Sequence, residues 1–300
     1  MSSSDEVIRV KDREIEVSSI EIDKKDLVVT GKILRIAKIK EEWYEDVEDP
    51  ALLIEYLKKT RLNADIFTFW QRLPDTKRKY NYYMEWDYIA ALTIKDFNHW
   101  WEKQIRSRTR GLIRKAERKG VIVREADFND EFVHGMTHIF NETPIRQGKT
   151  FWHYRKDFET VKREFSGYLF REDILGAYYE NELIGFIFLA YAGKYAITGQ
   201  IISMIKHRDK APNNALIAKA VEICDRKKIP YLVYLNWGDG TLAEFKRRNG
   251  FEKTALPRYF IPLTIKGKIA LILHLHHSLV DILPKKWKYF LLRLRKRIYA

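Results

Sequence analysis

Four cationic side chains in one short loop have the composition of an anion-binding site. The loop precedes a predicted helix at about 212–226 and contains Lys206, His207, Arg208 and Lys210. Pro212 suits the first turn of that helix, where the backbone N–H groups lack partners and the helix dipole favours negative charge. The loop therefore predicts a cradle for a phosphate or a similar anion. The alternative is an ordinary βαβ core with a solvated basic loop.

A second polar cluster follows a helix that is expected to end at Thr143-Pro144. It forms a compact loop of four residues, Arg146, Gln147, Gly148 and Lys149. A guanidinium group matches the two oxygen atoms of a carboxylate or phosphate, so this loop is a candidate for binding an anionic substrate. A solvated connector is the alternative.

Two groups of histidines were considered as metal ligands. His134, His138 and Glu142 are each four residues apart, which could place two imidazoles and a carboxylate around one ion. They lie opposite the predicted core face of their helix, so a solvated face is expected. The run His274, His276 and His277 is interpreted as polar interruptions of a packed helix. We therefore expect no metal site.

The composition predicts a folded protein of the reducing cytoplasm. The chain has 300 residues, of which 46% are hydrophobic, enough for a substantial core. Its single cysteine, Cys224, excludes an intramolecular disulfide and is expected to be a packed thiol. The N-terminus lacks the apolar core of a signal peptide, and no run of about 18 apolar residues is present. A cytoplasmic location is expected, with a peripheral position at the inner face of the membrane.

The net charge of +14 is concentrated in two segments. Residues 102–119 hold eight cations against two carboxylates, and residues 266–300 hold nine against one. The first segment is predicted to be one long helix, 94–119, with a basic stripe made by Arg106, Arg110, Arg114 and Arg118. Either a solvated face or contact with tRNA, phosphate or lipid head groups would explain the stripe.

The C-terminal segment 285–300 has an apolar stripe that includes Trp287, surrounded by lysines and arginines. A basic amphipathic helix of this kind suits an anionic membrane surface, and docking on the protein body is the alternative. We expect four parts along the chain: a first α/β unit at 1–93, the basic connecting helix at 94–119, a second unit at 120–264, and the tail at 265–300.

Three sequence passages reduce the number of folds that the chain could adopt. They are RTRGLIRKAERKGVIVRE (108–125), FNETPIRQG (140–148) and AEFKRRNGFE (243–252), and they are embedded in the order helix, antiparallel strands, strand, helix, strand, helix. Together they resemble the FemAB-type transferases, which carry two tandem units of the GNAT acyltransferase fold. The resemblance implies an α/β (α+β) fold with mixed, mostly antiparallel sheets flanked by helices.

The resemblance also implies an activity, namely acyl or aminoacyl transfer that forms an amide or ester on an anionic cell-envelope precursor such as one of peptidoglycan. The donor would be a co-substrate, aminoacyl-tRNA or an acyl-CoA, and no tightly bound cofactor is expected. Ala211 and Asn213 stand where GNAT pyrophosphate loops carry glycine, and Lys246 stands where many carry a tyrosine acid. An acetyl-CoA-dependent N-acetyltransferase, or a degenerate module that binds RNA or anionic membrane, are the alternatives.

Individual roles follow from this resemblance. The candidate base is Glu142, with His153 and Tyr154 as further candidates, and Lys246 would neutralise developing or leaving-group charge. The acceptor would contact Asn141, Thr143, Arg146, Gln147, Trp237, Arg110 and Arg114. The donor would contact Ser203, Arg208, Lys210, Asn213, Asn214 and Asn236.

Overall fold

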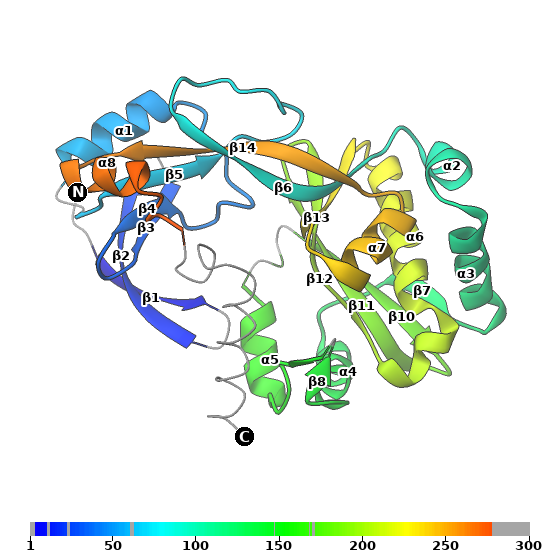
Figure 1. The fold of residues 1–300 in the computed structure, drawn as a ribbon. Helices are drawn as coiled ribbons and strands as arrows, with labels where there is room; N and C mark the ends of the chain where they lie inside the picture. The colour runs from blue at the N-terminus through cyan, green and yellow to red at the C-terminus, as the bar shows by residue number, and fades with distance from the viewer. Residues whose placement is uncertain are drawn as a thin grey trace. The chain divides into compact units, whose positions relative to one another are not determined.

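The computed structural model describes residues 4–10, 13–22, 25–60, 63–146, 148–167, 169 and 172–277. These residues form two compact units, coloured along the chain in Figure 1. The first comprises Met1–Gln71, Lys79–Glu85 and Arg258–Ala300, and the second comprises Arg72–Arg78 and Trp86–Pro257. The chain passes between the units within two strands, β6 (Tyr83–Thr93) and β14 (Glu252–Pro262), and also after Gln71 and after Arg78.

The first unit is built on a sheet whose strand order is β1-β2-β3-β4-β5-β14. Neighbouring strands are antiparallel except β4 and β5, which are parallel. The strands are β1 (Ser4–Val10), β2 (Arg13–Ile22), β3 (Lys25–Thr30), β4 (Ile36–Ile39) and β5 (Ile66–Trp70).

Two helices complete this unit, α1 (Pro50–Lys59) and α8 (Ile265–Ile272). Helix α1 begins where Asp49 accepts hydrogen bonds from the N–H groups of Ala51 and Leu52. The core between the helix and the sheet is fully buried at Leu27, Phe67 and Tyr259.

The second unit contains the strand order β6-β13-β12-β11-β10-β7. All neighbours are antiparallel except β12 and β13, which are parallel. The bounds are β7 (Ile122–Glu125), β10 (Glu172–Tyr179), β11 (Glu182–Ala192), β12 (Tyr195–Ser203) and β13 (Tyr231–Asn236). Residues 183–190 of β11 are all buried, which shows that both faces of this central strand are covered.

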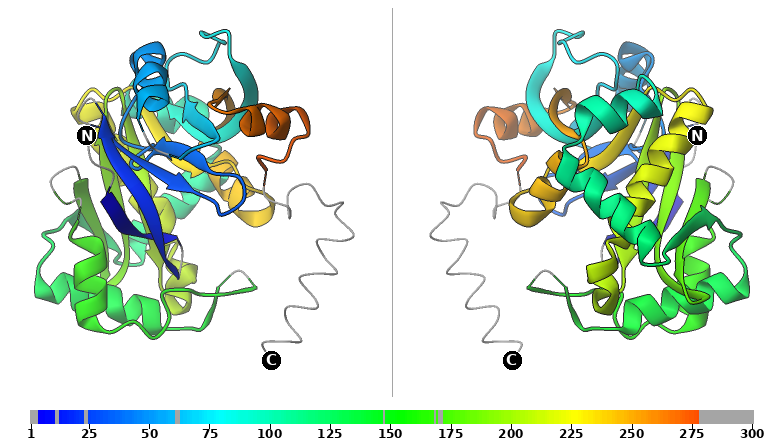
Figure 2. Two further views of the ribbon diagram at one scale, coloured as in Figure 1. Left: turned by 90° about the vertical axis from the view of Figure 1, so that its left-hand side faces the viewer. Right: turned by 90° about the vertical axis from the view of Figure 1, so that its right-hand side faces the viewer.

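Helices cover the sheet of the second unit. Side by side, α4 (Asp130–Asn141) and α5 (Phe158–Phe165) pack through aromatic rings onto Phe186 and Phe188 of β11 (Figure 1). Helix α6 (Pro212–Arg226) lies along β10, β11 and β12 and is flanked by α3 (Ser107–Arg118), as the right-hand view of Figure 2 shows.

Shorter elements connect these helices and strands. They are α2 (Phe97–His99), a π-helical turn at Trp100–Gln104, the two-residue strands β8 (Ile145–Arg146) and β9 (Lys149–Thr150), a 3₁₀ helix at Ile205–Lys210, and α7 (Gly240–Arg248).

The predicted fold class is confirmed, because a mixed and mostly antiparallel sheet is flanked by helices. The basic C-terminal helix expected at 285–300 lies outside the described residues. Within the described part of the chain, no helix is long and apolar enough to cross a membrane.

The prediction of one continuous helix over 94–119 is wrong. The helix is interrupted at Ile105 and Arg106, whose backbones are extended. The interruption lets Ile105 and Trp100 be buried, with the Trp100 indole donating to the carbonyl of Asn249 at 3.0 Å. The Arg110 guanidinium donates to the carbonyls of Trp101 and Ile105 that the break leaves without helical partners. Arg106 therefore does not belong to the helical stripe.

Two further helix predictions need correction. The sequence also favours a helix over 154–165, but α5 begins only at Phe158, because Asp157 accepts a hydrogen bond from the N–H of Thr160 and caps the helix there. Helix α8 ends at Ile272, and His274 has a left-handed φ of 54°. The three histidines from 274 to 277 therefore lie in a turn after the helix rather than within it.

Gly267 lets α8 approach the first-unit sheet. A Cβ on Gly267 would lie 1.9 Å from the carbonyl oxygen of Asp65, whereas a Cβ on Gly111 in α3 would meet nothing within 4 Å. We predict that Gly267→Ala lowers the melting temperature in scanning calorimetry, because the backbone must move to relieve the clash. Gly111→Ala should stabilise by roughly 0.5–1 kcal/mol through helix propensity. Equal behaviour of the two variants would contradict the close packing of α8.

Candidate active site

The parallel strands β12 and β13 are paired over only three residues. Tyr195, Ala196 and Ile197 are in register with Tyr231, Leu232 and Val233. Beyond these positions β12 continues its pairing with β11 as far as Ser203, and β13 continues with β6 as far as Asn236. The two strands therefore part towards their carboxyl ends, and each leaves backbone groups there that the other does not satisfy.

A bulge in β13 directs it away from β12, and Lys246 stabilises that bulge. The register with β6 shifts between Val233 and Asn236, and Leu235 has a left-handed φ of 46°. Lys246 of α7 is 2% exposed, and its ammonium group donates to the carbonyls of Tyr234 at 2.8 Å and Asn236 at 2.5 Å. Burial lowers the pKa of Lys246 to about 8. The lysine therefore satisfies carbonyls that the bulge has removed from the sheet.

The end of β12 is held by an ion pair from the end of α4. The Glu142 carboxylate accepts hydrogen bonds from the N–H groups of Ile205 and Lys206, at 2.7 and 2.8 Å. It also accepts from Arg146 at 3.0 Å, and Arg146 in turn donates to the carbonyls of Ser203 and Ile139. Three donors occupy the oxygens of Glu142, which gives this residue a positioning role for the loop after β12.

Glu172 is an acidic residue near the point where β12 and β13 separate, and the sequence alone does not single it out. It is the first residue of β10, and its Oε1 lies 3.9 Å from the place where a Cβ of Gly199 would be. Gly199 sits at the register shift of β12 against β11. Burial alone raises the pKa of Glu172 to about 7, so the carboxyl exchanges a proton near neutral pH. Such a group is suited to general base catalysis.

The sequence carries only a weak signal for Glu172. A charged residue followed by the apolar strand residues 174–177 resembles any strand start. Its side chain reaches Gly199 of β12, a neighbour that the local pattern does not reveal.

The predicted residues of the 141–154 segment have structural contacts. Asn141 donates to the carbonyl of Lys156 and accepts from the N–H of Arg155, and the Thr143 hydroxyl is bonded to the backbone of Ile145. His153 is fully buried, stacked on Phe140 at 4.2 Å, and its Nδ1 lies 3.2 Å from the Lys156 ammonium. Tyr154 is half-buried. Gln147 falls outside the described residues.

The predicted donor-side residues of the loop and helix have different surroundings. Arg208 is exposed, and the Lys210 ammonium lies 4.5 Å from the ring of Tyr179. Asn213 has a buried side-chain oxygen without a hydrogen-bond partner among the described residues. Asn214 donates to the Asn249 side chain at 3.1 Å.

The remaining predicted residues lie on β12, β13 and α3. Ser203 is buried and accepts from Arg146 through its carbonyl, and Asn236 is exposed. The Trp237 N–H donates to the carbonyl of Tyr88. Arg114 lies over the Trp101 ring at 5.5 Å. Arg110 donates to backbone carbonyls at the interruption before α3, as described above. The site assignments themselves stay predictions.

A cavity of about 570 Å³ adjoins the start of α6. Its walls come from α3, the first turn of α6, and α7, and they include Asn214, Asn249, Arg108 and Arg248. Two guanidinium groups and two amides give this wall the chemistry to contact an anionic group. Glu244 also lines it and pairs with Arg248 at 2.6 Å, so part of the positive charge is compensated.

The FemAB-like resemblance that the sequence predicts is confirmed at the level of the fold by solved structures. The chain is similar to FemX, with a TM-score of 0.57 at 11% identity, covering 85% of this chain and 89% of that one. No protein-family model and no curated protein sequence matches this chain.

Two further structures share the fold. One is the C-terminal domain of a protein assigned as a lysylphosphatidylglycerol synthetase from Agrobacterium fabrum, with a TM-score of 0.57 at 12% identity, covering 85% of this chain and 87% of that one. The other is L-PGS from Bacillus licheniformis, with a TM-score of 0.56 at 13% identity, covering 85% and 88%.

The role assigned to Lys246 can be tested by stability measurements. Lys246→Met keeps the apolar stem but leaves the carbonyls of Tyr234 and Asn236 without their donor, so we expect a loss of roughly 1–3 kcal/mol in urea denaturation at pH 7. Between pH 8 and 10 the folded chain holds Lys246 neutral while the unfolded chain keeps it protonated. The wild type should therefore gain stability over the variant as the pH rises. Lys253→Met, at an exposed position, is the control, and a matching loss there would refute the assignment.

Glu172 gives the opposite pH dependence. Its pKa is raised in the folded chain from 4.5 to about 7, so folding favours the protonated acid and stability falls as the pH rises from about 4.5 to 7. We expect Glu172→Gln to match the wild type near pH 5 and to exceed its stability at pH 8, measured by denaturation at both values. Glu117→Gln, at an exposed position of α3, should show no such difference.

Proposed function

We propose that this chain is an acyl- or aminoacyltransferase that forms an amide or ester bond on an anionic cell-envelope precursor. The observation that carries the proposal is the separation of β12 and β13 near Glu172, a half-buried carboxyl with a pKa of about 7. Unpaired strand N–H groups can stabilise an oxyanion, and a carboxyl that titrates near neutrality can accept a proton. The fold shared with FemX and the two lysylphosphatidylglycerol synthetase structures supports the same class of reaction.

The reaction balances without any other reactant. The acceptor amine or hydroxyl attacks the carbonyl carbon of the donor, and Glu172 takes the proton that the nucleophile loses. The tetrahedral oxyanion, held by strand N–H groups, then collapses and breaks the bond to the sulfur of CoA or the terminal oxygen of tRNA, which leaves with the proton that Glu172 accepted. Positioning supplies most of the acceleration, because both reactants are held in one geometry. Lys246, Glu142 and Arg146 fix the two strands that provide that geometry.

The start of α6 supports aminoacyl-tRNA over an acyl-CoA as donor. Ala211 is buried and occupies a left-handed conformation, φ 54°, at the position before Pro212. A methyl group in place of a glycine hydrogen limits the approach of a pyrophosphate to the first N–H groups of the helix. An aminoacyl ester does not need that cradle. Contacts of tRNA or anionic lipid with the basic segments 107–118 and 285–300 stay predictions.

Transfer assays test the proposal directly. The full chain is incubated with a mixture of labelled aminoacyl-tRNAs, or with labelled acetyl-CoA. The acceptor is either a nucleotide-linked peptidoglycan precursor or vesicles of phosphatidylglycerol. We expect label to enter one of the two acceptors from aminoacyl-tRNA. Label from acetyl-CoA alone would establish an N-acetyltransferase instead, and no transfer from either donor would refute the proposed function.

The base assignment has its own test in the pH profile. With Glu172 as base, kcat/KM should rise about tenfold per pH unit below pH 7 and level off above it, because only the ionised carboxylate accepts the proton. Glu172→Gln should lower the plateau by 10²–10⁴-fold and abolish the rise. The control is Glu117→Gln. A profile that keeps its rise in Glu172→Gln would assign the base to another group.

A further inference from the structure

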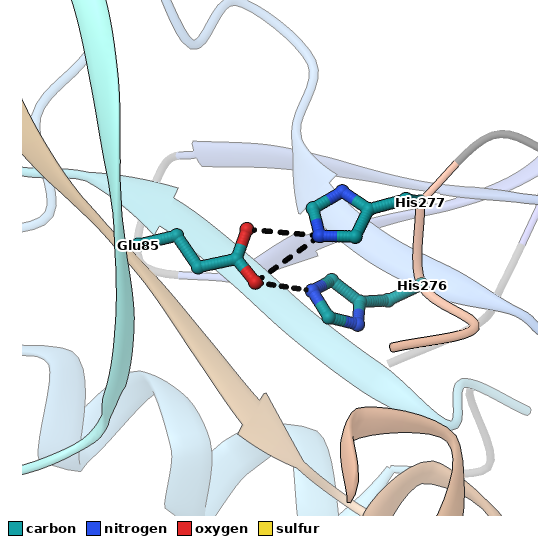
Figure 3. Close-up of side chains that lie close together, drawn as sticks. All are labelled: Glu85, His276 and His277. Carbon is teal, nitrogen blue, oxygen red and sulfur yellow. Dashed lines mark hydrogen bonds and ion pairs between the residues drawn. The ribbon is translucent and has the colours of Figure 1, made fainter. Parts of the chain in front are cut away.

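Three potential metal ligands meet in the first unit. Glu85 is in β6, and His276 and His277 lie in the turn that follows α8, 191 and 192 residues later in the sequence. Figure 3 shows both imidazole rings pointing at the Glu85 carboxylate. The Nε2 atom of His276 lies 2.9 Å from Glu85 Oε1, and that of His277 lies 3.1 Å from the same carboxylate.

The ligand atoms are spaced closely enough for one ion. One atom from each of the three residues lies within 4.8 Å of the other two. Zinc binds imidazole nitrogen and carboxylate oxygen at about 2.0–2.2 Å, which places tetrahedral ligands about 3.3–3.5 Å apart. The observed 2.9–3.1 Å contacts would open by a few tenths of an ångström around an ion, a change that side-chain rotation provides.

We propose that Glu85, His276 and His277 form a binding site for a divalent transition-metal ion, for which zinc is the best match. Two imidazoles and one carboxylate are borderline ligands that suit zinc, whereas calcium and magnesium prefer sites made of oxygen alone. Three protein ligands leave a fourth tetrahedral position for water.

The surroundings support this ligand set. The Tyr83 hydroxyl donates to Glu85 Oε1 at 2.9 Å and lies 3.3 Å from Nδ1 of His274, so it orients the carboxylate from the side of the strand. His276 is almost completely buried and packs edge-on against Phe260. Its Nδ1 has no hydrogen-bond partner among the described residues, which leaves that atom free to carry the ring proton when Nε2 binds the metal.

The site would act as a cross-link within the first unit. It would connect the turn after α8 to β6, two segments that are far apart in the sequence. Glu172 and Lys246 belong to the second unit, so the metal proposal is independent of the proposed chemistry. Because the metal binds only the folded arrangement, its binding energy adds to the stability of this unit.

Zinc titration of the full chain tests the proposal. The protein is expressed without a polyhistidine tag, stripped with a chelator, and titrated by calorimetry with zinc chloride. We expect one zinc per chain with a micromolar or lower Kd, and a rise in melting temperature when zinc is present. Cobalt(II) in place of zinc should give the visible absorption of a tetrahedral site.

Variants locate the bound ion. His277→Ala changes a partly exposed side chain and should weaken zinc binding at least tenfold, as should Glu85→Gln. His138→Ala removes an exposed histidine of α4 in the second unit and should leave zinc binding unchanged. Absence of one-to-one binding in the wild type, or equal binding in His277→Ala, Glu85→Gln and the wild type, would overturn the proposal. Circular dichroism of each variant confirms that the comparison is between folded chains.

Discussion

The second unit depends on keeping two neighbouring parallel strands apart. Hydrogen bonding favours continued pairing of β12 and β13, so their separation after three residues must be stabilised by other groups. A bulge and a left-handed leucine turn β13 away, and a buried lysine satisfies the carbonyls that this leaves. On the other strand, Glu142 at the end of α4 and Arg146 of β8 satisfy the terminal backbone groups. The separation is thus held from both sides by charged side chains.

Charged side chains are tolerated in the interior near the point where β12 and β13 separate, because main-chain groups form hydrogen bonds with them. A lysine or glutamate in a protein interior costs free energy unless it has hydrogen-bond partners, and here most of the partners are main-chain groups that would otherwise be unsatisfied. Glu172 differs, because burial raises its pKa and no donor to its carboxylate is seen among the described residues. A group whose charged form is disfavoured in this way is typical of a reacting centre rather than of a structural ion pair.

Much of the fold could be predicted from the sequence because its signals are local. The continuous apolar runs of β10 and β11 and the cap of α4 at Asn129 each lie within a dozen residues. The interruption at Ile105 could not be predicted, since it depends on a hydrogen bond from the Trp100 indole to the carbonyl of Asn249, 149 residues away. The same limit applies to the candidate site. Polar residues at helix ends were identified, but local patterns do not tell whether Glu142 binds a substrate or the backbone of Ile205.

The discontinuity of the first unit has a consequence for how the chain is made. Strand β5 pairs with β14, so Trp70 cannot pair with Arg258 until Arg258 has been synthesised. Helix α8 is synthesised only after that. During synthesis the strands β7, β10, β11, β12 and β13 emerge together and can assemble while the first unit still lacks its sixth strand. Contacts this distant in sequence form slowly, because a long loop must close first. Until Pro262 has been synthesised, the apolar edge of β5 needs protection from aggregation, and fragments that end before this point should depend on chaperones.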